Sequence, residues 1–90
     1  MTKKEREAII NELVDYCTED MNIYFTLDMI DKFFDIIAEL DTETYQKIYS
    51  EYTPFFYDAI SLLGNYIYSM LKALDDSLLE KVYKKVLEEI

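Results

Sequence analysis

The segment from Thr53 to Leu74, TPFFYDAISLLGNYIYSMLKAL, decides the fold that we expect for this chain. Thr53 is suited to cap a helix, and Pro54 suits the first helical position because its missing N–H needs no partner there. Apolar residues then recur at steps of three and four and cover more than half of the circumference. The main stripe consists of Phe56, Ile60, Leu63, Ile67, Met70 and Leu74. Because so apolar a helix must lie among others, we predict a central apolar helix over about 54–74.

The composition of the whole chain favours helices over strands. One glycine and one proline in 90 residues leave few turn formers, and the apolar periodicity is that of a helix throughout. Half of the residues are apolar, which argues against disorder despite a formal charge of −10. A chain of this length supports one core. We therefore predict an all-α fold, with residues 1–90 forming a single domain, a compact bundle of four to five helices.

Capping signals place the ends of the first two helices. Thr2 to Glu5 matches a capping box that would open the first helix, and Thr26 is expected to cap a second helix that runs through Leu40. Between Thr18 and Phe25 the pattern fits a helix end, a continuation or a connection, and these alternatives stay open. The residues expected to face inward are Ile10, Leu13, Val14, Cys17 and Met21 in the first helix and Ile30, Phe33, Phe34, Ile37 and Leu40 in the second.

Two further helices are expected on either side of the central one. Asp41 is predicted to cap a short helix before Thr53, and Asp75 and Asp76 to end the central helix. The run from Ser77 to Glu80 matches another capping box, which would open the last helix. The residues expected to face inward are Tyr45, Ile48, Tyr49 and Tyr52 in the short helix and Leu79, Val82, Val86 and Ile90 in the last.

The sequence holds no pattern of an enzyme, a metal site or a cofactor site. It has no histidine, its only glycine is Gly64 inside a predicted helix, and Cys17 falls within an apolar stripe. We therefore expect no catalysis and no cofactor, and a lone cysteine suits a reducing, cytoplasmic setting. Polar residues along one side of the central helix argue against a membrane span. The negative charge argues against direct binding to nucleic acid, because it repels phosphate.

A stripe of carboxylates is the first candidate for a binding surface. Asp28, Asp31, Asp35 and Glu39 follow one another at helical spacing, with Lys32 as the sole basic residue between them. Tyrosine is enriched at binding surfaces, and this chain has nine tyrosines. The predicted partner-binding residues are Asp28, Asp31, Asp35, Glu39, Glu43, Tyr45, Tyr49 and Tyr52. The alternative interpretation is a solvated face that only keeps the protein soluble.

A line of small residues on the central helix is the second candidate. Ser61 and Gly64 lie one turn apart between Tyr57 and Tyr68, so these four residues could form a notch. Glycine lowers helix stability by about 1 kcal/mol relative to alanine, so we expect a favourable interaction at Gly64 that offsets this loss. One interpretation is close crossing by a helix of the same domain, and the other is a docking notch for a second copy, as in a homodimer, or for another protein.

These features together predict a protein that acts by binding another protein with a basic surface. Few residues are Gly, Ala, Arg or Pro, a composition that favours AT-rich codons. In size, charge and this composition the chain is similar to small antagonists that phages and mobile elements encode against host nucleases, including anti-CRISPR proteins. That similarity implies an inhibitor that occupies a basic, nucleic-acid-handling surface as a nucleic-acid mimic. The alternative is a structural or regulatory helical module, including a homodimer, whose acidic face only confers solubility.

Overall fold

The computed structural model describes residues 1–51 and 60–89 of the protein, and over these residues it contains five α-helices and no strand. The helices are α1 (Lys3–Thr18), α2 (Ile23–Leu40), α3 (Thr42–Glu51), α4 (Ile60–Lys72) and α5 (Asp76–Glu89). The predicted all-α fold is therefore confirmed. The predicted start of the central helix at Thr53 and Pro54 lies outside the described residues, as do Tyr52 and Tyr57.

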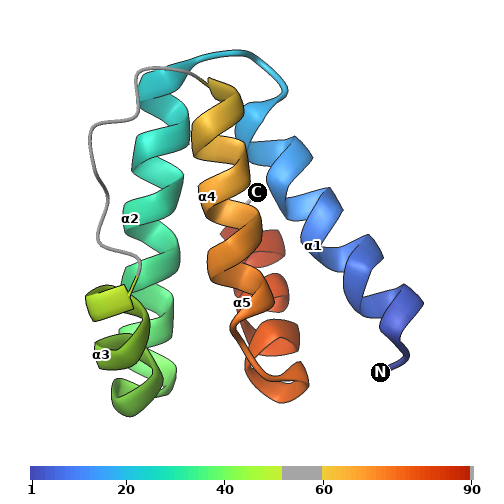
Figure 1. The fold of residues 1–90 in the computed structure, drawn as a ribbon, viewed down its shortest axis with the longest axis vertical. Coiled ribbons are helices and arrows are strands. Elements are labelled where there is room, and N and C mark those ends of the chain that lie inside the picture. Colours follow the sequence, from blue (N-terminus) through green and yellow to red (C-terminus); the bar gives the residue numbers. More distant parts are fainter. Residues whose placement is uncertain (52–59, 90) are drawn as a thin grey trace.

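The helices form a bundle in which α4 lies between α1 and α2 (Figure 1). The main helix contacts join α1 to α4 and α2 to α3, and α5 contacts both α2 and α1 (Figure 1). The short α3 therefore packs beside the second half of α2, at one edge of the bundle. This arrangement leaves the outer sides of α1 and α2 facing away from one another.

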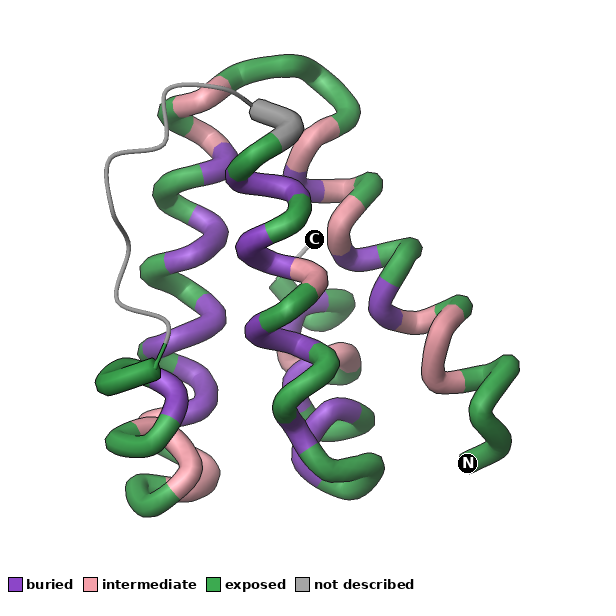
Figure 2. The backbone as a smooth tube through the Cα atoms, in the orientation of Figure 1, coloured by how far each residue is buried: buried purple, intermediate pink, exposed green. Residues whose placement is uncertain are grey.

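The core is built from one apolar side of each helix, as the sequence pattern predicts. Figure 2 shows buried positions recurring along the inner sides of α1, α2, α4 and α5. Among the described residues, the fully buried side chains include Ile10, Phe33, Ile37, Ile48, Leu63, Ile67, Met70, Leu71, Leu74, Leu79, Val82 and Val86. The expected inner faces agree with this core except at Met21 and Tyr49, which are 72% and 50% exposed. Val14, Leu40 and Tyr45 are only half-buried, and the side chains of Tyr52, Phe56, Ile60 and Ile90 lie outside the described residues.

Two of the predicted helix caps are confirmed. The Thr2 hydroxyl accepts a hydrogen bond from the Glu5 N–H, and the Glu5 side chain accepts one from the Thr2 N–H, which completes the capping box. A carboxylate oxygen of Asp41 accepts a hydrogen bond from the Thr44 N–H at 3.2 Å, and its other oxygen accepts one from the Thr44 hydroxyl at 2.9 Å. These bonds lower the pKa of Asp41 below its usual value.

The predicted start of α2 at Thr26 is wrong. Asn22 caps this helix, because its side-chain oxygen accepts hydrogen bonds from the N–H groups of Tyr24 and Phe25. Thr26 lies in the first turns, fully buried, and its hydroxyl donates to the Cys17 carbonyl at 2.7 Å. The open question about residues 18–25 is also answered, since α1 ends at Thr18 and Met21 adopts a positive φ of 54°. That left-handed conformation takes Met21 out of the α1 stripe.

The predicted capping box at Ser77 is also wrong, by two residues. Asp75 is the residue that caps α5, because its carboxylate accepts a hydrogen bond from the Leu78 N–H at 2.8 Å. α4 has already ended at Lys72, so Asp75 caps the next helix rather than ending this one. Arg6 of α1 fastens this turn: its guanidinium donates to the carbonyls of Lys72 and Leu74 and pairs with Asp76 at 2.9 Å.

Candidate protein-binding surface

The predicted acidic stripe lies on the side of α2 that faces solvent. Asp28, Asp31, Asp35 and Glu39 are all exposed. Phe33 and Ile37, on the opposite side of the helix, are fully buried. Because this buried side fixes the rotation of α2 in the bundle, it also fixes the direction in which the carboxylates point. The helix thus presents four carboxylates from one rigid element.

Lys32, the basic residue within this stretch, is held by another helix. Its ammonium group lies 2.9 Å from a carboxylate oxygen of Glu89 in α5. The hydrogen bond and the attraction to Glu89 raise the pKa of Lys32 above its usual value. Since Lys32 pairs with Glu89 across the bundle, its charge is already balanced by a carboxylate outside the stripe.

The tyrosines of α3 pack against α2. The ring of Phe34 makes edge-on contacts with Tyr45 and Tyr49, with centroids 6.2 and 5.9 Å apart. The two tyrosine rings lie 5.7 Å from each other. Such pairs stabilise by about 0.5–1.5 kcal/mol beyond the area they bury. Tyr45 is therefore half-buried and helps to hold α3 in place, whereas Tyr49 is 50% exposed and Glu43 is exposed nearby in the first turn of α3.

Two exposed apolar residues extend the stripe and were missed in the sequence. Tyr24 is 78% exposed and Leu27 is 40% exposed, and both lie in the first turns of α2. Helical spacing puts Tyr24 one turn before Asp28 and Leu27 one turn before Asp31. Asn22 could have revealed this, because a helix capped by Asn22 places Tyr24 and Leu27 on the same side as the carboxylates. We name the side formed by Tyr24, Leu27, Asp28, Asp31, Asp35 and Glu39 the α2 surface.

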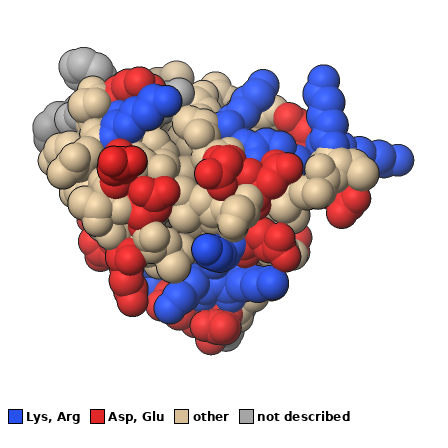
Figure 3. Space-filling model, turned by 90° about the horizontal axis from the view of Figure 1, so that it is seen from below, with Lys and Arg blue, Asp and Glu red and all other residues tan. Residues whose placement is uncertain are grey.

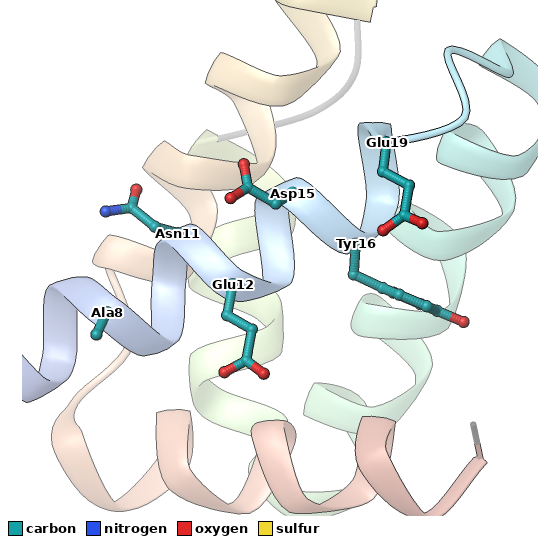
Figure 4. A pocket seen from close by; sticks show the side chains of 6 residues that line it. All are labelled: Ala8, Asn11, Glu12, Asp15, Tyr16 and Glu19. Carbon is teal, nitrogen blue, oxygen red and sulfur yellow. The ribbon is translucent and has the colours of Figure 1, made fainter.

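The outer side of α1 carries a second, smaller group of carboxylates. Glu12, Asp15 and Glu19 are exposed and border a shallow hollow beside Tyr16 (Figure 4). Glu12 points toward α5, where it accepts a hydrogen bond from the Tyr83 hydroxyl, and this bond raises the pKa of Tyr83. Residues 7–31 contain seven carboxylates and neither lysine nor arginine. The acidic character of this protein is therefore concentrated where α1 passes into α2.

The basic residues lie mainly at the other end of the bundle. Figure 3 looks at the end where α1 begins and α4 passes into α5, and shows Lys and Arg side chains interspersed with carboxylates. Lys84 pairs with Glu80 one helical turn away at 3.2 Å, and Arg6 pairs with Asp76. Glu89 of α5 pairs with Lys32 of α2. The end where α1 passes into α2 is therefore more negative than the opposite end, and the molecule has an uneven electrostatic potential.

The predicted notch on α4 faces α1. A Cβ atom built on Gly64 would lie 3.6 Å from a methyl carbon of Thr18 and 3.7 Å from one of Val14. The Tyr68 hydroxyl donates to the Glu7 carboxylate at 2.8 Å, and this bond raises the pKa of Tyr68. Gly64 thus lies where two helices of one domain cross, which agrees with the first interpretation. The side chains of Tyr57 and Ser61 lie outside the described residues.

Among the described residues, no group of three or more acidic or cysteine side chains is placed to hold a metal ion. Cys17 is 1% exposed, and burial raises the pKa of its thiol to about 12, so it is a buried apolar side chain rather than a nucleophile. In residues 1–51 and 60–89, no helix has both the length and the apolar character to cross a bilayer.

Comparison of the chain with protein-family models, with curated proteins and with solved structures found no match.

Proposed function

We propose that this protein binds another protein through the α2 surface, and that the partner offers a basic surface that normally handles nucleic acid. In this proposal it acts as an inhibitor of the phage or mobile-element type, like an anti-CRISPR or anti-nuclease protein, inside the cell where such nucleases work. The observation that carries the proposal is the α2 surface itself, which combines four exposed carboxylates with two exposed apolar side chains on one rigid helix.

The spacing of the carboxylates limits how closely they can imitate a nucleic acid. Asp28 and Glu39 are eleven residues apart, which corresponds to about 16 Å along a helix. One strand of duplex DNA carries about five phosphates over the same length, at roughly 3.4 Å per phosphate. The α2 surface offers four negative groups over this distance. It is therefore suited to occupy part of a groove lined by Lys and Arg, and electrostatic steering would speed the encounter.

Tyr24 and Leu27 supply what carboxylates alone lack. Exposed ion pairs contribute only about 0–1 kcal/mol each, so charge by itself gives fast association but weak retention. An exposed aromatic side chain that becomes buried on binding slows dissociation, because tyrosines and other large side chains dominate interface energies. We expect Tyr24 to be the main anchor, with Leu27 beside it and Tyr49 at the margin of the contact.

The proposal is tested by capture from cells that carry the gene, followed by release of the partner in a salt gradient. The wild type should retain a basic nucleic-acid-binding protein that rising salt releases, because salt screens exposed charges. A variant with Asp28, Asp31 and Asp35 changed to Asn should retain much less of it. These three side chains are exposed, so helix content and melting temperature should stay the same.

A matched control carries the same change of charge on α1. Asp15→Asn, Glu19→Gln and Asp20→Asn also replace three exposed carboxylates and bring the net charge from −10 to −7. This control should capture the partner like the wild type. Equal retention by all three proteins would mean that the α2 surface only confers solubility, as in a structural or regulatory module, and the proposal would be withdrawn.

A further inference from the structure

A groove with apolar walls lies between the start of α1 and α5, away from the α2 surface. Its walls are formed by Met1, Glu5 and Ile9 on one side and by Glu80, Tyr83, Lys84 and Leu87 on the other. Met1 is 44% exposed and Leu87 is 47% exposed, while Ile9 and Tyr83 are half-buried. Glu5 and Ile9 lie together on α1, and Glu80, Tyr83, Lys84 and Leu87 lie together on α5, because residues three or four apart share one side of a helix.

The charges around this groove differ from those of the rest of the molecule. Residues 1–6 contain three basic residues and one acidic residue, and residues 77–90 contain three of each, although the whole chain carries −10. Glu80 and Lys84, which pair at 3.2 Å, place both signs on one wall, and Glu5 adds a carboxylate on the other. A surface that holds both signs can complement a second copy of itself.

We propose that two copies of this chain associate through this groove, with Leu87 of each copy inserted between Ile9 and Tyr83 of the other. A two-fold axis makes every such contact twice, so Lys84 of one copy can face a carboxylate of its partner, and the reverse. Two α2 surfaces brought together in the same way would oppose carboxylates to carboxylates. A second copy therefore meets less repulsion at the α1–α5 groove than at the α2 surface.

The sign of the salt dependence separates this association from the proposed function. Each copy carries −10, so the two copies repel one another at long range, and salt weakens that repulsion. Salt should therefore strengthen the association of two copies. Salt should weaken the binding of a basic partner to the α2 surface, because it screens the attraction between opposite charges.

Sedimentation equilibrium of the purified protein tests the proposal. The protein concentration should run from roughly 10 µM to roughly 1 mM, because weak complexes have dissociation constants in this range. The average mass should rise from 10.8 kDa toward twice that value with concentration, and should rise further at high salt. Leu87→Asp should weaken the association at least tenfold, because it replaces the apolar side chain that inserts into the other copy with a carboxylate. Leu87→Ala should weaken it less, without any change of charge.

The matched control is Leu27→Asp, which adds the same charge at a leucine of similar exposure on α2. It should associate like the wild type, and circular dichroism should show equal helix content for all variants. A wild-type mass that stays at 10.8 kDa over the whole range at both salt concentrations would overturn the proposal. So would association that Leu27→Asp abolishes and Leu87→Asp leaves intact.

Discussion

Gly64 offers a direct test of how α1 and α4 cross. Alanine at this position would place its Cβ 3.6 Å from a methyl carbon of Thr18 and 3.7 Å from one of Val14. Both distances are ordinary van der Waals contacts, so Gly64→Ala should fit without movement of either helix. A larger side chain would have to displace these neighbours.

The expected magnitude follows from two contributions of the same sign. Alanine favours the interior of a helix over glycine by about 0.8–1.0 kcal/mol. The added methyl group is buried against α1, which contributes up to about 0.8 kcal/mol. We therefore expect Gly64→Ala to raise the free energy of unfolding by about 1 kcal/mol, which corresponds to roughly 4–8 °C in melting temperature for a domain of this size. Gly64→Leu should instead lower it by about 1–3 kcal/mol through overpacking.

Urea unfolding followed by circular dichroism measures both variants. Asn65→Ala is the control, because Asn65 is the next residue of α4 and is exposed, so it reports helix propensity without burial. The control should gain less than Gly64→Ala. A loss of stability in Gly64→Ala would refute the crossing described here, since it would mean that the two helices approach more closely than these distances allow.

Three other residues give predictions that need no partner. Arg6→Lys keeps the charge but loses the planar fork that reaches two carbonyls and Asp76, so it should lower the free energy of unfolding by about 1–3 kcal/mol, while Lys4→Ala should change little. Asp41 has a lowered pKa, so it stabilises the fold above its unfolded pKa near 3.8, and that contribution is lost as the pH falls through the lower folded value. The difference in melting temperature between wild type and Asp41→Asn should therefore shrink below about pH 4. Cys17, with a pKa of about 12, should react with iodoacetamide at pH 8 only as fast as the chain unfolds, and at once in denaturant.

The helix ends show how far the sequence could be interpreted. Thr2 and Asp41 were predictable because each is the cap candidate next to its helix and is supported by the residue three positions later. At the start of α2 there are two candidates four residues apart, Asn22 and Thr26, and local rules do not choose between them. Tertiary contacts decide, because Ile23 and Phe25 pack against the core and the Thr26 hydroxyl finds a partner in Cys17.

The candidate surface was predictable only in part, for the same reason. The carboxylates of α2 follow from helical spacing, and all are exposed as that spacing requires. Tyr24 was missed because it belongs to the turn that a start at Thr26 leaves out. Leu27 directly follows Thr26 and was missed because the prediction considered only the carboxylates of this side. The tyrosines of α3 could not be sorted by spacing alone, because their exposure depends on Phe34, which lies on another helix.

The central claim is that the α2 surface binds a basic partner, and the most direct measurement of it is the kinetics of that binding on an immobilised captured partner over a range of salt. The Asp28, Asp31 and Asp35 to Asn variant should associate more slowly, with a flatter salt dependence, because it has lost electrostatic steering. Tyr24→Ala should associate at nearly the wild-type rate and dissociate faster. A triple Asn variant that associates at the wild-type rate with the wild-type salt dependence would contradict the claim.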